Sequence, residues 1–568
     1  MEKGKRMEQN KQPKWKFVRN IIITLIALGL VAGVFLVAPD YILKDKYEGT
    51  RLIINNKDVT ASGRLKNELI IEDDVIYLSK SDISNFFDKY LYYDNQYGQF
   101  ITTEGDKVAT IKAGESKITI NGITSDIKGR IIQKGNELYL PISDLNEVYN
   151  IDIKKIDSTN IILIDSLDRE QIQAKAVKDI KVKVKEKILS RTIAEVNKDE
   201  SVVIVSDDGK GWAKVRTNTG IIGFVNSSDL KDKTTTRQAK IEKPQIDGKI
   251  SMVWDYYSQY VSIPNRQGTQ IDGINVISPS LFELKKLGKG QIIDKTGGTQ
   301  GKQYLEWARQ NGYKIWPLFG NDGMIETTSE ILNDYELRQK VIEGIVQLIK
   351  TYNLDGINID FENMYKEDKD MYSRFIIELY PRVKACNAVL SVDLTAPDGG
   401  DTWSMCFDRN VIADNSDYIV FMAYDQYTAG SKKAGTTAGF NWVKNNIEKF
   451  LGQEGVAKEK IILAMPFYTR LWTEDASGNV ETQTIVNMKD LATALPENIT
   501  KTWNETLRQF YAEYKDGAKT KKIWIEDIKS LHEKLTLVND YKLAGAAYWA
   551  LDRQDDGVWN EIKTTLLK

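Results

Sequence analysis

Three polar side chains alternate with apolar ones in the stretch LDGINIDFE, residues 354–362. Asn358, Asp360 and Glu362 are two positions apart, and isoleucine or phenylalanine fills the positions between them. Because side chains on a β-strand alternate between its faces, the pattern predicts a strand with one polar and one apolar face. The polar face would bring two carboxyl groups and an amide together, a combination suited to acid–base chemistry.

A solvated strand face would also explain this alternation. However, long helical segments flank the stretch, as expected of a parallel strand that is covered by helices. Carboxylates are costly to bury in such a strand and are seldom there without a function. We therefore interpret residues 354–362 as part of a candidate catalytic site whose apolar face packs against helices.

The elements around this strand predict an α/β fold. From residue 249 onward, apolar strands alternate with amphipathic helices, which indicates a parallel sheet. Eight β/α units in about 320 residues favour a (β/α)8 TIM barrel over residues 248–568, with LDGINIDFE as its fourth strand. Active sites of such barrels lie at the carboxyl ends of the strands, where Glu362 is expected. The strands are predicted near Ile250–Trp254, Gly273–Ile277, Lys314–Leu318, Gly356–Phe361, Val389–Leu394, Tyr418–Ala423, Ile461–Pro466 and Ala544–Trp549.

The gap between the last two strands, about 75 residues, is too long for a single crossover helix. It predicts a small α+β insertion at about residues 470–540. Within it, Arg508–Tyr514 and Lys522–Glu526 are expected to form a hairpin around Asp516-Gly517.

Three motifs at strand ends resemble those of glycoside hydrolase family 18. Residues 355–362, DGINIDFE, are similar to the family's DGxDxDxE signature, and residues 422–425, MAYD, are similar to its MxYD motif. Trp549 ends the eighth strand, where the family keeps the tryptophan at the floor of its cleft. The stretches VWDYYSQ, NVISPS, MPFYTRLW and KIWIEDIKS resemble the bacterial cell-wall and spore-associated branch of the family.

The resemblance implies a glycosidase that uses the substrate's own N-acetyl group as the nucleophile. Glu362 would be the general acid and then the base, Asp360 would orient the acetamide, and Tyr424 would hydrogen-bond the acetamide oxygen. Trp549 would support the sugar under attack, and Asp425 would line the same subsite. Such a mechanism needs no metal and no cofactor, predicts net retention and requires a 2-acetamido sugar.

The remaining substrate-binding candidates are Met422 of the MAYD motif and several aromatic residues at strand ends or in the insertion. The aromatic rings could stack on sugars, and for each of them a place in the hydrophobic core is an equal alternative. These aromatic candidates are Trp254, Tyr468, Trp472 and Trp503.

The sequence departs from the family signature at Asn358, where the family usually has aspartate. In the family that inner aspartate shares a proton with the middle one, which shifts both pKa values. Asn358 can hydrogen-bond Asp360 but cannot take its charge, so we expect Asp360 to titrate more simply here than in the family. Asparagine at this position also fits the spore and wall branch.

Two further modules are predicted before the barrel. Residues 76–83, IYLSKSDI, are repeated as residues 138–145, LYLPISDL, and each copy predicts a short strand leading into a helix start. This α+β region, residues 51–166, resembles the N-terminal domain of copper amine oxidases but has no histidine to bind copper. Residues 175–231 resemble a bacterial SH3-like domain, which implies a small all-β barrel with cell-wall ligands. The polar residues 232–247 predict a linker.

The N-terminal region has the pattern of a membrane anchor. Residues 1–20 are rich in lysine and arginine, and residues 21–38 carry no charge. A helix of this length is about 27 Å long, which favours an uncleaved transmembrane segment over a cleaved signal peptide. The basic residues precede the segment, which predicts a cytoplasmic N-terminus and a catalytic domain outside the membrane.

Composition excludes several classes of function. The formal net charge of −2 gives no basis for nucleic-acid binding. The single histidine, His532, excludes a histidine-dependent catalytic triad in the main domain and histidine-rich metal sites. We interpret the chain as a surface-anchored hydrolase of β-1,4-linked N-acetylglucosamine glycan, with peptidoglycan favoured over chitin. The alternatives are a non-catalytic glycan-binding protein on the same barrel and a surface scaffold.

Overall fold

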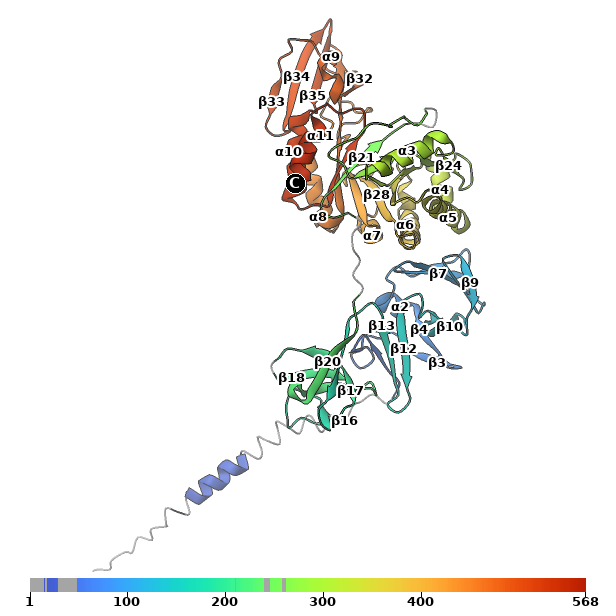
Figure 1. Ribbon diagram of the computed structural model, residues 1–568, viewed down its shortest axis with the longest axis vertical. Helices are drawn as coiled ribbons and strands as arrows, with labels where there is room; N and C mark the ends of the chain where they lie inside the picture. The colour runs from blue at the N-terminus through green and yellow to red at the C-terminus, as the bar shows by residue number, and fades with distance from the viewer. Residues whose placement is uncertain are drawn as a thin grey trace, which may run out of the picture. The chain divides into compact units, whose positions relative to one another are not determined.

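The structure is a computed structural model that describes residue 15 and residues 18–28, 49–209, 211–239, 246–257 and 262–567 (Figure 1). Contacts within the chain divide it into two compact units. Among the described residues, the first unit comprises those up to Lys89, Gly114–Ser116 and those from Asp126 to Glu242. The second comprises Tyr90–Ala113, Lys117–Ser125 and the described residues from 243 onward.

The internal repeat of the first unit forms two strands that pair with each other. Strands β4 (Val75–Ser79) and β11 (Glu137–Pro141) run antiparallel at the centre of a four-stranded sheet. Ser79 caps helix α2 (Lys80–Phe86), whereas Pro141 at the equivalent position makes no side-chain cap and only a short 3-10 turn follows it. The other strands of this region are β1 (Arg51–Ile54), β2 (Lys57–Asp58), β3 (Ile70–Glu72), β10 (Ile132–Lys134), β12 (Ile151–Ile156) and β13 (Ile161–Ser166).

Residues 171–237 form a seven-stranded sheet in the order β16-β15-β19-β18-β17-β14-β20. The predicted linker, residues 232–247, does not begin at residue 232. Strand β20 continues to Arg237 and pairs with β14. Residues 240–245 of that linker lie outside the described residues. The SH3-like character of this region stays a prediction. The strands are β14 (Gln171–Ala176), β15 (Ile180–Lys183), β16 (Thr192–Val196), β17 (Ser201–Asp207), β18 (Trp212–Arg216), β19 (Ile222–Asn226) and β20 (Leu230–Arg237).

The prediction of a single-pass membrane protein is wrong. Within the described part of the chain, no helix is long and apolar enough to cross a membrane. Residues 18–28 are helical, and residues 29–38 of the predicted span lie outside the described residues.

Eight parallel strand positions of the second unit close into a ring. β36 pairs with β30 on one side and with β21 on the other, which joins the eighth strand to the first. The third position consists of β25 and β26 on either side of Trp316-Pro317, and Asn358 N donates to the Pro317 carbonyl at 2.9 Å, so pairing continues across the break. This ring is consistent with the predicted (β/α)8 barrel. Its strands are β21 (Ile250–Asp255), β22 (Val276–Pro279), β25 (Lys314–Ile315), β26 (Leu318–Gly320), β27 (Gly356–Asp360), β28 (Val389–Thr395), β29 (Tyr418–Met422), β30 (Ile461–Pro466) and β36 (Gly545–Trp549).

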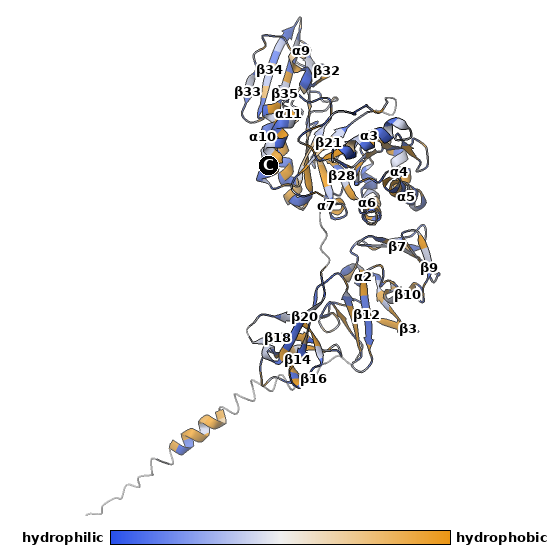
Figure 2. Ribbon diagram, in the orientation of Figure 1, coloured by the Kyte–Doolittle hydropathy of each residue, from blue (hydrophilic) through white to orange (hydrophobic). Residues whose placement is uncertain are grey.

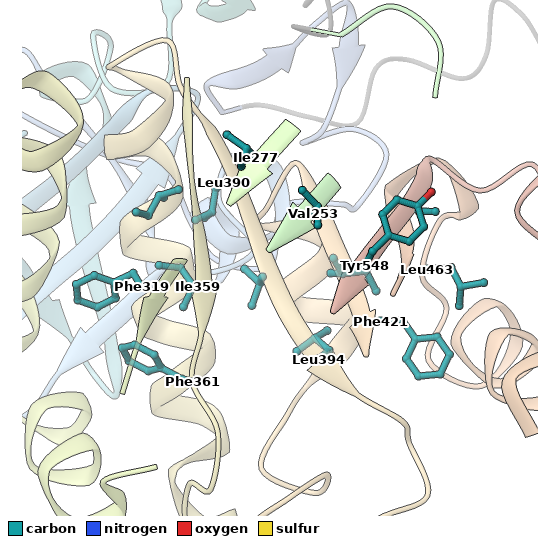
Figure 3. Close-up of a cluster of buried hydrophobic side chains, with 14 of the residues drawn as sticks. Val253, Ile277, Phe319, Ile359, Phe361, Leu390, Leu394, Phe421, Leu463 and Tyr548 are labelled. Atoms are coloured by element: carbon teal, nitrogen blue, oxygen red, sulfur yellow. The ribbon is translucent and has the colours of Figure 1, made fainter. Parts of the chain in front are cut away.

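The side chains of these strands alternate between two hydrophobic clusters. Ile357, Ile359 and Phe361 belong to the larger cluster, which lies between the strands and the helices (Figure 3). The predicted apolar face of residues 354–362 is therefore confirmed. Trp316 and Val420 belong to the smaller cluster inside the ring. Figure 2 shows hydrophobic residues along the barrel strands and hydrophilic ones on α3. The helices are α3 (Thr299–Gln310), α4 (Ile325–Asn333), α5 (Tyr335–Tyr352), α6 (Lys369–Lys384), α7 (Arg409–Asp414), α8 (Phe440–Gly452), α10 (Ile528–Asp540) and α11 (Val558–Leu566).

The predicted insertion between the seventh and eighth strand positions is a five-stranded sheet in the order β32-β31-β35-β34-β33. Its predicted hairpin is confirmed, because β34 and β35 pair antiparallel around Asp516-Gly517. The bounds are β31 (Tyr468–Glu474), β32 (Val480–Asn487), α9 (Leu491–Ala494), β33 (Thr502–Asn504), β34 (Gln509–Asp516) and β35 (Lys519–Ile525).

A second five-stranded sheet, from the N-terminal part of the chain, contributes to the second unit and contacts α6. Arg374 Nη2 donates to the Tyr90 carbonyl at 2.7 Å, and its guanidinium lies 4.8 Å from the centroid of the Tyr92 ring. The predicted domain over residues 51–166 therefore contributes residues to both units. The strands are β5 (Tyr92–Asp94), β6 (Gln99–Glu104), β7 (Lys107–Lys112), β8 (Lys117–Ile120) and β9 (Ile123–Asp126).

A fully buried ion pair joins α5 to α6. Arg338 Nε and Nη2 donate to the two carboxylate oxygens of Glu378 at 2.9 and 3.1 Å, and both side chains are 0 % exposed. Arg338 Nη1 also donates to the Leu332 carbonyl at 2.8 Å. Breaking such a pair from one side leaves a charge buried without a partner, which is strongly destabilising.

Replacing Glu378 by alanine is therefore expected to lower the free energy of unfolding by about 3–5 kcal/mol. Denaturant unfolding followed by tryptophan fluorescence measures the change. Glu459→Ala is the control, because the Lys458–Glu459 pair has 44 % and 68 % exposed side chains and its loss should cost under about 1 kcal/mol. Equal losses in the two variants would contradict the importance of the buried pair.

Candidate active site

A cleft of about 470 Å³ opens at the carboxyl ends of the barrel strands. Tyr256 follows β21, Asn321 follows β26 and Trp549 ends β36, so separate strand positions supply its walls. Most of the residues predicted from the sequence line this cleft. They are Asp360, Glu362, Met422, Tyr424, Asp425, Tyr468 and Trp549.

Glu362 lies two residues beyond the end of β27, and its backbone is held on both sides by Asn321. Asn321 Nδ2 donates to the Glu362 carbonyl at 2.8 Å, and the Glu362 amide donates to Asn321 Oδ1 at 3.0 Å. Asn321 itself follows β26, the neighbouring strand. These two hydrogen bonds fix the position from which the Glu362 carboxyl enters the cleft.

The carboxyl groups of the cleft hold protons more strongly than exposed ones. Burial raises the pKa of Glu362 well above its usual value, and the charges of Asp360 and Asp425 raise it further. Burial also raises the pKa of Asp360 to about 7. A carboxyl group that is still protonated near neutral pH can donate its proton to a leaving group. Glu362 therefore has the property that a general acid needs.

Tyr424 and Asp425 follow β29 and face the cleft beside the insertion. Tyr468 Oη donates to Asp425 Oδ1 at 2.7 Å, and Arg470 Nη2 donates to the same oxygen at 2.8 Å. The Tyr424 and Tyr468 rings are edge-to-face with centroids 6.4 Å apart. Burial raises the pKa of Tyr424 well above its usual value, so its hydroxyl remains a hydrogen-bond donor.

Trp549 forms the aromatic wall of the cleft together with Tyr256. Their ring centroids are 5.1 Å apart, and the Trp254 ring supports Trp549 from the side at 5.6 Å. Tyr256 is 51 % exposed, so its ring is accessible to a bound molecule. An aromatic face of this kind suits the apolar face of a sugar ring.

Four of the predicted substrate-binding residues do not line the cleft, and these predictions are corrected. Trp254 and Trp472 are 1 % and 0 % exposed, so neither ring can stack on a sugar. Trp503 lies in the insertion strand β33, where the Lys529 amine sits 3.6 Å from its ring centroid. Asn358 is 0 % exposed and lies behind the cleft.

Asn358 is held by side chains of three other barrel strands, β21, β22 and β28. Trp254 Nε1 and Ser278 Oγ donate to Asn358 Oδ1 at 2.8 and 3.4 Å. Asn358 Nδ2 donates to Ser391 Oγ at 3.1 Å and to Asp393 Oδ1 at 2.7 Å. Its role is thus to orient other groups inside the barrel.

The expectation that Asn358 hydrogen-bonds Asp360 is wrong. Asp360 Oδ1 is buried without a hydrogen-bond partner in the described part of the chain. The surroundings of Asp360 count against its simpler titration, because burial and then the charge of Asp360 raise the pKa of Asp393. A second carboxyl group therefore faces Asp360 from β28.

Three features of the cleft were not found from the sequence. The sequence does mark Asp393 as a candidate site residue, because its carboxylate lies within the apolar stretch LSVDLTA. Asn321 directly follows a barrel strand, which is also a recognisable position for a site residue. The ion pair of Lys295 Nζ with Glu283 at 3.1 Å could not be expected, because Glu283 lies on the short strand β23 (Phe282–Leu284) and Lys295 follows the short strand β24 (Ile292–Asp294), neither of which was predicted.

No group of three or more histidine, cysteine, aspartate or glutamate residues is arranged to hold a metal ion among the residues that the structure describes. The cleft's own residues supply carboxyl groups for proton transfer and the Tyr424 hydroxyl for hydrogen bonding.

Two segments of the chain match known families, and several known proteins are similar to it. Residues 249–554 match the Glycosyl hydrolases family 18, and residues 53–164 match the copper amine oxidase N-terminal domain. The uncharacterized glycosylase YvbX of Bacillus subtilis is 27 % identical over 51 % of this chain and 84 % of its own length. The cortical fragment-lytic enzyme of Bacillus subtilis is 23 % identical over 39 % of this chain and 52 % of its own length.

Among solved structures, the spore cortex-lytic enzyme SleL of Bacillus megaterium is 21 % identical and aligns with a TM-score of 0.48 over 60 % of this chain and 79 % of its own. The family match covers more than half of the chain and contains every barrel strand and the whole cleft described above. The chain belongs to the Glycosyl hydrolases family 18.

Proposed function

We propose that this protein hydrolyses β-1,4-linked glycan containing N-acetylglucosamine, with the acetamide of the substrate as nucleophile. The observation that carries the proposal is the buried carboxyl of Glu362, whose pKa is raised, beside Asp360 and Tyr424 in one cleft. Only one carboxyl group then has to act as acid and base, because the substrate supplies the nucleophile.

In the first step, the Glu362 carboxyl gives its proton to the glycosidic oxygen. The bond from that oxygen to the anomeric carbon breaks as the acetamide oxygen forms a bond to the same carbon. Asp360, as a carboxylate, accepts a hydrogen bond from the acetamide N–H and stabilises the positive charge of the oxazolinium ring. Tyr424 donates to the acetamide oxygen and holds it in line for attack.

In the second step, the Glu362 carboxylate takes a proton from water, whose oxygen attacks the anomeric carbon. The bond to the acetamide oxygen breaks, and the acetamide is regenerated. Two inversions at one carbon give net retention. Glu362 finishes the cycle protonated, which the raised pKa of this group favours.

Replacing Tyr424 by phenylalanine is expected to lower kcat by about 10–100-fold with a smaller change in KM, because the lost hydrogen bond matters most as charge develops on the acetamide. Initial rates on an N-acetylglucosamine oligomer measure both constants. Phe440→Leu, outside the cleft lining, is the control for the loss of packing at a partly buried aromatic residue. A Tyr424→Phe enzyme with parental kcat would contradict the role of this hydroxyl.

Peptidoglycan is favoured over chitin as the natural substrate. One relative is named a cortical fragment-lytic enzyme, which supports a glycan of the bacterial spore or wall. The proposed wall-binding role of residues 175–231 points the same way. A non-catalytic glycan-binding protein on the same barrel is the alternative.

The test is to incubate the purified protein, and its Glu362→Gln variant, with peptidoglycan and with chitin oligomers. Release of reducing ends by the parent alone supports the hydrolase, and the better substrate identifies the glycan. Binding of glycan by both proteins with cleavage by neither would support the alternative and overturn the proposal.

A further inference from the structure

Asp393 lies beside Asp360 on the inner face of the barrel. The parallel strands β27 and β28 pair Asn358 with Ser391. Two steps further along both strands, Asp360 comes next to Asp393, and the alternation of side chains puts all four residues on the same face. Asp360 and Asp393 both line the cleft. The barrel thus places two carboxyl groups side by side from neighbouring strands.

Asn358 fixes the orientation of Asp393. Trp254 Nε1 is only a donor, so the amide oxygen of Asn358 faces it and the amide nitrogen faces β28. That nitrogen donates to Asp393 Oδ1 at 2.7 Å. An aspartate at position 358 would present an acceptor oxygen to Asp393 instead. The amide on β27 and the carboxyl on β28 therefore form a matched pair.

The two aspartates resist being ionised together. Burial and the charge of Asp360 raise the pKa of Asp393, and burial raises that of Asp360. Asp393 is 1 % exposed, whereas Asp360 is partly exposed, so the proton is held at lower free energy on Asp393. Over a range of pH, the pair therefore carries one proton and one negative charge.

The groups that face Asp393 from its neighbours add no positive charge. Besides Asp360, they are Glu362 beyond β27, Tyr372 of α6 and Tyr424 beyond β29. Burial raises the pKa of both tyrosines well above their usual value, so they are neutral wherever the aspartates titrate.

We propose that Asp393 is a positioning residue that takes up the proton of Asp360, so that Asp360 meets the substrate's acetamide N–H as a carboxylate. The inference rests on the proposed function. The proton leaves the Asp360 carboxyl and binds a carboxylate oxygen of Asp393, so the pair keeps a charge of −1 and needs no other reactant. Asp393 thereby acts through Asp360 without touching the substrate.

Asp393→Asn tests the proposal, because it keeps an oxygen that accepts from Asn358 but cannot take up a proton. Asp360 must then lose its proton to solvent. The ratio of kcat at pH 5 to kcat at pH 8 is expected to fall at least about 10-fold, since the acid limb of the rate profile moves toward higher pH. A parental pH profile in this variant would overturn the proposal.

The double variant Asn358→Asp with Asp393→Asn separates positioning from structure. This double variant again has one carboxyl group and one amide at the same site, but the carboxyl group is now on β27 and the amide on β28. The ratio of kcat at pH 5 to kcat at pH 8 is expected to return to within about 3-fold of the parental ratio. Ser391→Ala, which removes a different partner of Asn358, is expected to leave the ratio unchanged. A double variant that behaves like Asp393→Asn would overturn the proposal.

Thermal unfolding tests the carboxyl pair without any activity. Groups whose folded pKa is raised stabilise the fold at low pH, and this stability is lost as pH rises through the folded pKa. The Tm of the parent should fall as the pH is raised from 4 to 8. The Tm of Asp393→Asn should fall by at least about 2 °C less over the same range. An equal fall in both proteins would overturn the pairing of the aspartates. If the parent cleaves no glycan but the Tm difference is found, the pairing stands and the proposed function fails.

Discussion

Glu362→Gln is expected to lower kcat by at least about 1,000-fold while glycan binding stays within about 3-fold of the parent. Glutamine resembles the protonated glutamic acid in shape and charge, so a bound glycan should meet almost the same surface. It can neither protonate the leaving oxygen nor deprotonate the attacking water. Both steps of the proposed reaction therefore lose their proton carrier.

The surroundings of Glu362 allow this substitution to change the side chain without changing the hydrogen bonds of the backbone. Asn321 holds the backbone on both sides of the residue through its own amide, so the hydrogen bonds do not depend on the Glu362 side chain. Release of reducing ends gives kcat, and isothermal titration with an uncleaved oligomer gives Kd. A variant that keeps more than about a tenth of the parental kcat would contradict the role of Glu362 as the acid and base.

Glu367→Gln is the matched control. Glu367 lies in the short turn Lys366–Asp368, close in sequence to Glu362, and its side chain is exposed. The same chemical change there is expected to leave kcat within about 2-fold of the parent. A large loss in this control would point to a general effect of removing negative charge near the cleft.

Removing the acetyl groups from the glycan is expected to lower the rate of cleavage at least about 1,000-fold. The acetamide oxygen is the nucleophile of the proposed reaction, and a free amine has no oxygen to offer at that position. A protonated amine would instead pair with the Asp360 carboxylate. The substrate could then still bind, but without a group to attack the anomeric carbon.

The measurement compares a chitin oligomer, its de-N-acetylated form and the same material after chemical re-N-acetylation. Only the first and third should be cleaved, and proton NMR of fresh product should show the retained β-anomer. Direct binding assays of the amine form show whether the loss arises in binding or in the reaction. Equal cleavage of all three, or an inverted product, would contradict substrate-assisted catalysis.

The succession of strands along the chain and the position of the DGINIDFE motif were predictable because they depend on local patterns. Alternation in residues 354–362 shows which side chains share a face whatever the fold, and the apolar face does belong to the cluster under the helices. The hairpin of the insertion was predictable for the same reason, since Asp516-Gly517 suits a tight turn. The prediction of a membrane anchor shows the limit of such patterns, because an apolar stretch indicates only hydrophobicity, and no described helix is both long and apolar enough to cross a membrane.

Burial of individual aromatic residues was not predictable. Trp254 and Trp549 both end barrel strands, yet Trp254 points to Asn358 inside the barrel and Trp549 lines the cleft. Trp472 lies on strand β31 of the insertion sheet and is buried, with its Nε1 donating to the Gly435 carbonyl at 2.8 Å. A tryptophan in the core and a tryptophan that stacks on a sugar can occupy the same position on a strand. Only the packing of segments distant in the sequence distinguishes the two.

The sequence by itself determined the strand that carries Asp360 and leads to Glu362, and the family to which the chain belongs. Only the tertiary structure decided which groups surround them. Asn358 and Asp393 are 35 residues apart and meet through the pairing of β27 with β28. A strand's own pattern reports its faces but not its neighbours, because parallel strands are joined through long crossovers whose return point is set by the packing of the whole barrel.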